Sequence, residues 1–185
     1  MWWPDRLATT ARIAGALALA ALVAGCFEPL YGERTLAGGP GIRDRLRLVE
    51  IEQIVAPNGT PDARLAVEVR NALIFELTGG EGSVGATHKL VIQLSSNRQQ
   101  VIVDTTTARP ESEVVGINAN YTLTEIASGR SVVTGSTFSR VSFDTPGQAQ
   151  RFARARGQRD AENRASKVIA ENIRTRLASY FSAGT

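Results

Sequence analysis

The chain offers few side chains that could carry out catalysis. His88 is its single histidine, and no carboxylate or second metal ligand lies near it in the sequence. A Ser-His-Asp site would have to use this histidine, and no serine lies in a G-x-S-x-G turn. The acidic pairs Glu50/Glu52 and Glu111/Glu113 have strand spacing, which predicts solvated strand edges. We therefore predict no enzymatic activity, no metal site and no cofactor.

One glycine-rich stretch, residues 80–85, matches the pattern G-x-G-x-x-G. A dinucleotide site needs this pattern after a strand and at the start of a helix, where phosphate meets the helix amides. Here the stretch follows a predicted helix and precedes a predicted strand. The sequence therefore does not predict a nucleotide site.

The chain begins with a short apolar segment. The apolar run Ile13–Gly25 spans 13 residues and follows Arg6 and Arg12. A transmembrane helix needs about 20 apolar residues, whereas about 10 to 14 is typical of the apolar region of a secretory signal. The run therefore predicts export from the cytoplasm.

The leader ends at the single cysteine of the chain, Cys26. The sequence Val-Ala-Gly-Cys at residues 23–26 resembles a bacterial lipobox. This resemblance implies that residues 1–25 are a removed signal peptide and that Cys26 carries a diacylglycerol and an amide-linked acyl chain such as palmitate. Two or more acyl chains anchor a protein stably to a membrane. An ordinary cleaved signal that contains a cysteine, or a short uncleaved anchor, are the alternatives.

Composition predicts an ordinary globular domain behind the leader. Hydrophobic residues make up 43% and charged residues 21%, which argues against wholesale disorder. No cysteine is left to form a disulfide, so packing alone must hold the fold. Residues 148–182 contain eight basic and three acidic side chains, a net charge of +5. Such a stripe suits a solvated helix face or an anionic amphiphile, and export makes nucleic acid a poor partner.

The order of elements follows from hydrophobic periodicity and from turn residues. We expect a glycine- and proline-rich lipidated tether over residues 26–44, one domain over 45–182 and a tail over 183–185. Within the domain, the patterns predict a strand near 45–54, a helix over 61–78, strands over 89–103, 113–125 and 132–143, and a helix over 148–182 that Gly157 could kink. A loop is expected at 104–112.

These elements predict an α+β fold in the order β-α-β-β-β-α. The first strand, helix and second strand make a βαβ unit, which places the first two strands parallel with a right-handed crossover. Two helices with apolar stripes bury both stripes by packing on one face of a four-stranded mixed sheet. The prediction is a two-layer sandwich whose second face stays wet and carries Asn118, Asn120, Thr122 and Thr124.

With these features in place, the mature chain resembles the LptE family of lipopolysaccharide-assembly lipoproteins in its alphaproteobacterial form. The lipobox is followed by Pro-Leu-Tyr-Gly at residues 29–32, the elements have the family's order, and the chain ends with the stretches 160–162 and 176–181. Phe27 follows the cysteine where relatives usually have glycine. It is also not aspartate, the residue that favours retention in the inner membrane of enteric bacteria.

The resemblance implies a role without catalysis. LptE-like proteins are anchored in the outer membrane on its periplasmic side, sit within the β-barrel LptD as plug and folding partner, and contact lipopolysaccharide on its way to the outer leaflet. Arginine pairs with phosphate in a fork geometry, so Arg98, Arg130 and Arg140 are candidate lipopolysaccharide contacts. The arginines between residues 151 and 159 form a second candidate group. The alternatives are a generic periplasmic binding or adaptor lipoprotein, or a lipoprotein hydrolase.

Overall fold

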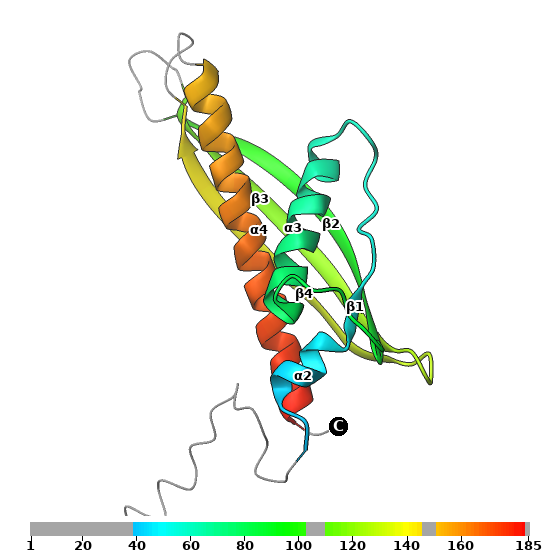
Figure 1. Ribbon diagram of the computed structural model, residues 1–185. Coiled ribbons are helices and arrows are strands. Elements are labelled where there is room, and N and C mark those ends of the chain that lie inside the picture. The colour runs from blue at the N-terminus through cyan, green and yellow to red at the C-terminus, as the bar shows by residue number, and fades with distance from the viewer. Residues whose placement is uncertain (1–38, 103–109, 146–150, 184–185) are drawn as a thin grey trace, which may run out of the picture. The chain divides into compact units, whose positions relative to one another are not determined.

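A computed structural model of the chain describes residues 39–102, 110–145 and 151–183 (Figure 1). The chain divides into two units, Met1–Gly41 and Ile42–Thr185. In order, the elements of the second unit are α2 (Ile42–Arg47), β1 (Val49–Ile51), α3 (Pro61–Thr78), β2 (His88–Ile102), β3 (Pro110–Glu125), β4 (Ser131–Asp144) and α4 (Arg151–Ser182). The leader, Cys26 and the tether up to residue 38 lie outside the described residues.

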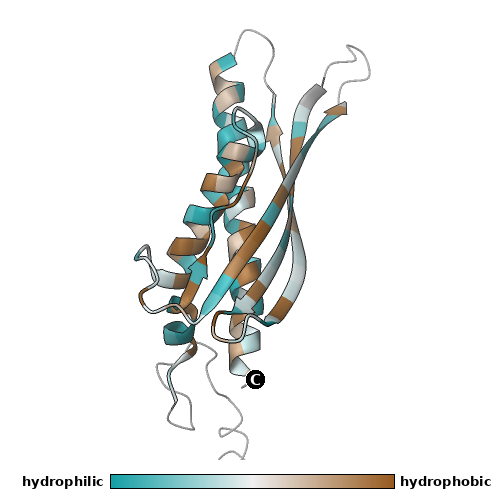
Figure 2. Ribbon diagram, turned by 90° about the vertical axis from the view of Figure 1, so that its right-hand side faces the viewer, coloured by the Kyte–Doolittle hydropathy of each residue, from teal (hydrophilic) through white to brown (hydrophobic). Residues whose placement is uncertain are grey.

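The four strands form one mixed sheet in the order β1-β2-β3-β4. β1 runs parallel to β2, and β2, β3 and β4 are antiparallel neighbours. Both long helices, α3 and α4, lie on the same side of this sheet (Figures 1 and 2). The predicted α+β fold, with a four-stranded mixed sheet and two helices on one face, is confirmed.

The first predicted strand is wrong at its start, because Ile42–Arg47 form the short helix α2. Ile42 and Leu46 lie four residues apart and are both buried, which is helical spacing. Of the residues predicted near 45–54, only Val49–Ile51 form a strand. Its two end residues are buried and its middle residue is exposed. Short apolar runs fit both periods, so periodicity alone could not separate helix from strand here. The unit that contains the sheet and both long helices begins at Ile42.

The loop predicted at 104–112 is also too long, because β3 begins at Pro110. Ser112 pairs with Val101 and Pro110 with Ile102, across an irregularity in the register. Proline is tolerated at the first position of a strand, where its missing N–H leaves no interior ladder bond unmade. The other long strands lie within one residue of their predicted bounds.

The ends of α3 follow the predicted chemistry. Thr60 is in an extended conformation, and its hydroxyl accepts a hydrogen bond of 3.3 Å from the amide of Ala63. Pro61 occupies the first turn, where its missing N–H costs nothing. Gly79 ends the helix with a φ of 76°, a conformation that favours glycine.

α4 is a single helix of 32 residues, and its apolar stripe packs on the sheet and on α3. The side chains of Ala165, Ile169, Ile173 and Leu177 are fully buried, as the stripe predicted. Val168 was predicted in the same stripe but is 40% exposed. The helix continues through Gly157, where an added Cβ atom would lie 3.4 Å from Cδ2 of Phe143.

At a second glycine, Gly135, an aromatic ring lies against the backbone of the neighbouring strand. Gly135 of β4 lies opposite Tyr121 of β3, and the buried Tyr121 ring covers it. A Cβ atom at position 135 would lie 2.6 Å from the Tyr121 hydroxyl oxygen and 2.7 Å from Cζ. Contacts this short force the ring to move, so the pair depends on glycine.

We predict that Gly135→Ala lowers the free energy of unfolding by about 1–3 kcal/mol, the usual cost of overpacking a filled core. Urea denaturation followed by circular dichroism measures the change. Gly82→Ala is the matched control, because no atom lies within 4 Å of its added Cβ and its φ is ordinary. Equal losses in the two variants would show that the Tyr121 ring does not depend on this glycine.

Candidate functional site

The face of the sheet away from α3 and α4 is open, and no described helix packs on it (Figure 2). Its side chains come from alternate positions of β2, β3 and β4 and are mostly amides and hydroxyls. They include Gln93, Ser95, Asn97, Gln99, Asn118, Asn120, Thr122, Thr124, Thr134, Ser136 and Ser142. Along 91–101, 114–124 and 132–142 of these strands, Arg140 is the single charged side chain on this face.

Strand register lines these polar side chains up across the sheet. Gln93 pairs with Asn120, which pairs in turn with Ser136. Ser95 pairs with Asn118, which lies opposite Phe138. Directly opposed side chains on a sheet lie about 5 Å apart, so the first row carries donors and acceptors across three strands, whereas the second carries them across two and ends at an aromatic ring. The face offers many hydrogen bonds and very little net charge.

Arg140 is held on the open face by its neighbours. Its guanidinium carbon lies 5.5 Å from the centre of the Phe138 ring, a cation–π distance. Opposite it, Gly116 has no side chain; the Asn97 side chain occupies the space that a Cβ atom would need, and the Arg140 stem lies in ordinary contact with that space at 3.8 Å. Phe138 itself is 63% exposed. The arginine and the ring are therefore displayed together on the open face of β4, the edge strand of the sheet.

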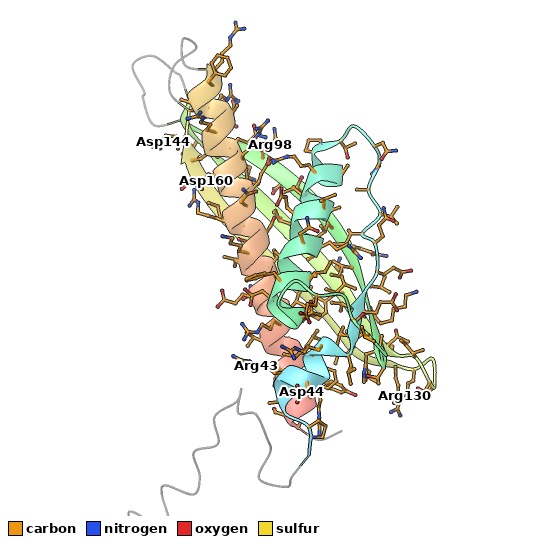
Figure 3. All side chains as sticks on the ribbon, viewed as in Figure 1. Arg43, Asp44, Arg98, Arg130, Asp144 and Asp160 are labelled. Atoms are coloured by element: carbon orange, nitrogen blue, oxygen red, sulfur yellow. The ribbon has the colours of Figure 1, made fainter. Side chains whose placement is uncertain are left out.

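The structure places the three candidate arginines in three different environments, and Figure 3 labels two of them, Arg98 and Arg130. Arg140 lies on the open face, and Arg130 lies in the turn between β3 and β4. Arg98 lies on the helix-facing side of β2, where its guanidinium contacts Glu162 of α4 at 3.3 Å. The candidates do not form one cluster, and Arg98 already has a partner within the protein.

Glu162 is a buried carboxylate that the sequence analysis missed. Only 1% of its side chain is exposed, and it pairs with Arg98 and with Arg64 of α3. Gln158 donates a further hydrogen bond to it at 2.8 Å. A buried carboxylate is stable only when it is paired. Glu162 therefore ties together α3, α4 and β2.

Glu113 is a second buried acid. Its side chain is 6% exposed and pairs with Arg154 of α4, so the solvated edge predicted for Glu111 and Glu113 is wrong for Glu113. The alternation of β3 contained the necessary signal, because residue 113 has the same parity as the buried Val115 and Ile117. For Glu162, the signal was its position beside Ala161 and Ala165 in the apolar stripe.

His88 begins β2, as predicted, and contributes to packing. Its ring lies edge-on to Tyr180 and Phe181, with centroid distances of 6.4 and 5.2 Å. Burial lowers the pKa of His88, and the carboxylate of Glu125, which lies opposite it in β3, acts in the other direction. Thr87 Oγ lies 2.8 Å from its Nδ1. These contacts join the start of β2 to the end of α4.

In the part of the chain that the structure describes, no three His, Cys, Asp or Glu side chains gather closely enough to hold a metal ion. None of the helices within the described ranges is long and apolar enough to span a bilayer.

A model of the LptE family, described as lipopolysaccharide-assembly, matches residues 49–177 of this chain. The match runs from β1 to the last turns of α4 and covers more than half of the 185 residues. The chain belongs to the LptE family. Membership confirms the resemblance seen in the sequence and makes this LptE protein part of lipopolysaccharide assembly in the Gram-negative envelope, in a family without enzymatic function.

Solved structures share the fold of this LptE protein. A predicted lipoprotein from Caulobacter crescentus CB15 superposes with a TM-score of 0.60 at 24% identity, covering 78% of this chain and 97% of that one. The rare lipoprotein B from Shewanella oneidensis superposes with a TM-score of 0.51 at 13% identity, covering 73% of this chain and 96% of that one. A search of curated proteins found no match.

We predict that Glu162→Gln destabilises the protein by about 1–3 kcal/mol, because it weakens charged hydrogen bonds to two arginines. Arg64 and Arg98 are 40% and 39% exposed, so water limits the loss. The midpoint and slope of chemical denaturation measure this loss in the free energy of unfolding. Asp160→Asn removes the same charge from the same helix at a 68% exposed site paired with Arg164, and should cost less than about 0.5 kcal/mol. Similar values for the two variants would contradict the role given to Glu162.

Proposed function

We propose that this LptE protein is an outer-membrane lipoprotein that occupies the lumen of the LptD barrel and takes part in moving lipopolysaccharide to the outer leaflet. The family match supports the place in lipopolysaccharide assembly. The barrel partner, the position in its lumen and the outer-membrane anchor are the steps that we add.

The observation that carries the proposal is the open polar face of the sheet. The interior of a large outer-membrane barrel presents polar side chains, because its apolar side chains face lipid. A face of amides and hydroxyls can exchange its hydrogen bonds with water for hydrogen bonds with such a wall. On the open face, Arg140 is the single charged side chain along the strand stretches 91–101, 114–124 and 132–142, so little charge has to be desolvated on contact.

The anchor in this proposal is Cys26, carrying diacylglycerol and an amide-linked acyl chain after removal of residues 1–25. Structural relatives named as lipoproteins support this assignment. Acyl chains on this residue hold the folded unit at the periplasmic side of the outer membrane. The segment between Cys26 and Ile42 then serves as the tether.

For lipopolysaccharide itself, Arg140 and Arg130 are the proposed contacts with phosphate groups. Both side chains are exposed, and neither makes an ion pair with another described residue. Arg98 could reach a ligand only by leaving Glu162. The second group of candidates comprises the arginines between residues 151 and 159. Three of them are exposed, Arg151, Arg156 and Arg159, whereas Arg154 pairs with Glu113.

We predict that the double substitution Asn118→Glu/Asn120→Glu strongly reduces the amount of LptD that co-purifies with the full-length lipoprotein after mild detergent extraction. Two carboxylates in the central strand would have to be buried without partners at the barrel wall, which is costly. Both residues are exposed in the free protein, so the fold should be retained. The measured quantity is the ratio of barrel to lipoprotein in the eluate.

The matched control is Asn71→Glu/Asn163→Glu, which adds the same charge at exposed positions of α3 and α4. This variant should retain the barrel at close to the unsubstituted ratio. Equal retention by both double variants would exclude the open face as the contact surface. An unsubstituted protein that elutes free of any barrel would favour a periplasmic adaptor lipoprotein.

We further predict that Cys26→Ala abolishes acylation. The mass spectrum of the unsubstituted protein, purified from membranes, should show a chain that begins at residue 26 with the added mass of its acyl groups. The alanine variant should lack this mass and either retain the leader or leave the membrane fraction. An unmodified Cys26 with an intact leader in the native protein would overturn the lipid anchor.

A further inference from the structure

β4 forms one edge of the sheet, because β3 is its single neighbour in the order β1-β2-β3-β4. Alternate residues of an antiparallel strand direct their backbone N–H and C=O groups toward the neighbouring strand and away from it. Half of the residues of β4 therefore direct these groups to the outside of the sheet.

The register identifies the outward-facing residues. The amide of Glu52 donates to the carbonyl of Leu90, so Leu90 faces β1 and the next residue of β2 faces β3. Carried across the paired residues, the same alternation turns Val133 of β4 toward β3. The residues of β4 that face outward are Val132, Thr134, Ser136, Phe138, Arg140 and Ser142.

This outward edge is largely unpaired and unprotected. Arg164 of α4 donates a hydrogen bond of 3.4 Å to the carbonyl of Ser142, near one end of the strand. Between Thr134 and Arg140, the described residues supply no partner to the outward backbone groups. Proteins usually protect such an edge with proline, lysine, a bulge or an inward-facing charge. From Val133 to Phe143, β4 has none of these, and its register with β3 is uninterrupted.

On the covered face of the sheet, α4 overhangs the edge (Figure 1). Arg164 reaches Ser142, and Asn172 donates a hydrogen bond of 3.0 Å to the hydroxyl of Thr137. Val168 is four residues from each of these two helix residues and lies on the same side of α4. It is 40% exposed, although the sequence places it in the apolar stripe. The sheet is thus one strand too narrow to cover Val168.

The open face carries a second exposed apolar side chain at the same edge. Phe138 is 63% exposed and is one of the outward-facing residues. A strand added beside β4 would place a side chain about 5 Å from it. Such a strand would pair the free backbone groups and also bury Phe138 on one face and Val168 on the other.

We propose that the added strand is β4 of a second copy, which runs antiparallel about a two-fold axis at Phe138. The two four-stranded sheets then form one continuous sheet, and the interface is self-complementary. In this register Phe138 lies opposite Phe138 of the second copy, and Arg140 lies opposite Ser136. Opposed aromatic side chains stabilise a strand pair, whereas a register with Arg140 opposite Arg140 is destabilised by like charge.

The charges of the edge favour an identical strand over a strongly acidic or basic one. From Val132 to Phe143, Arg140 is the single charged residue of β4. On α4, the flanking Arg164 already pairs with Asp160 at 2.8 Å. Two such edges bring few charges together, and a highly charged strand finds little complementary charge here. The pairing concerns the lipoprotein without a barrel and does not rest on the function proposed above.

Sedimentation equilibrium of the purified full-length lipoprotein, in a neutral detergent and over a range of protein concentrations, measures self-association. We expect a concentration-dependent equilibrium between one chain and two. A single chain at every concentration would overturn the second copy as partner. If this monomer still co-purified with LptD, the proposed function would stand and the dimer alone would fail.

Ser136→Pro and Val168→Glu should each raise the dissociation constant of the dimer by at least about tenfold. The proline removes an outward N–H and no bond to β3, and the glutamate places a carboxylate under the added strand. Both side chains are exposed in the free protein, so the unfolding midpoint should change little.

Val67→Glu is the matched control. Val67 is a 56% exposed valine of α3, which packs on β1, β2 and α4 rather than on β4. Its substitution should leave the dissociation constant within about twofold. All variants carry the same anchor, so two chains that merely share a micelle would persist in every variant. A dimer of unchanged affinity in both edge variants would overturn the pairing through β4.

A cysteine cross-link tests the register. In the proposed pair, the Cβ atoms of Phe138→Cys lie about 5 Å apart, so a short bis-maleimide should join them. Those of Thr134→Cys lie about 27 Å apart, because about 3.3 Å of rise per residue separates them over about eight positions. The unsubstituted protein gives the background from Cys26. Equal cross-linking of the two variants would overturn the two-fold axis at Phe138.

Discussion

The organisation of this protein depends on a sheet that is buried on one face only. Successive side chains of a strand point to opposite faces, and α3 and α4 cover one of them. On the covered face Val115, Ile117, Ala119 and Leu123 are almost fully buried. On the other, amides and hydroxyls remain in contact with solvent. A one-residue slip of any long strand would exchange these faces, so the same alternation holds the core together and creates the polar surface.

Burial also determines what the charged side chains can do. Glu113 and Glu162 lie inside the two-layer core, and each takes at least one arginine as an internal partner. Arg98 and Arg154 join α4 to strands, and Arg64 joins α3 to α4. Arg130, Arg140 and Arg176 make no ion pair with another described residue, and their side chains are exposed. The basic excess of α4 is thus divided between internal pairing and exposed charge, and only the exposed charge can meet an anionic ligand.

The sequence predicted secondary structure correctly where a local signal was strong, and wrongly where the helix and strand patterns overlapped. Thr60 and Gly79 bounded α3 correctly, because a hydroxyl cap and a left-handed glycine act within one turn. The alternation in β3 identified both faces of the sheet. Residues 42–47 were misread, because a six-residue helix offers too few turns for its period to stand out from a strand. The partners of Arg98 could not be foreseen, because 64 residues separate it from Glu162.

By itself, the sequence determined the family, the order of the long elements and the polar character of one sheet face, because composition, capping and periodicity act over a few residues. The tertiary structure alone decided which arginines are paired and which are free, and it alone brought the β3–β4 turn beside the end of α4. Both outcomes depend on side chains far apart in the chain, and their distances follow from how helices pack on a twisted sheet. Local pattern carries no information on those distances.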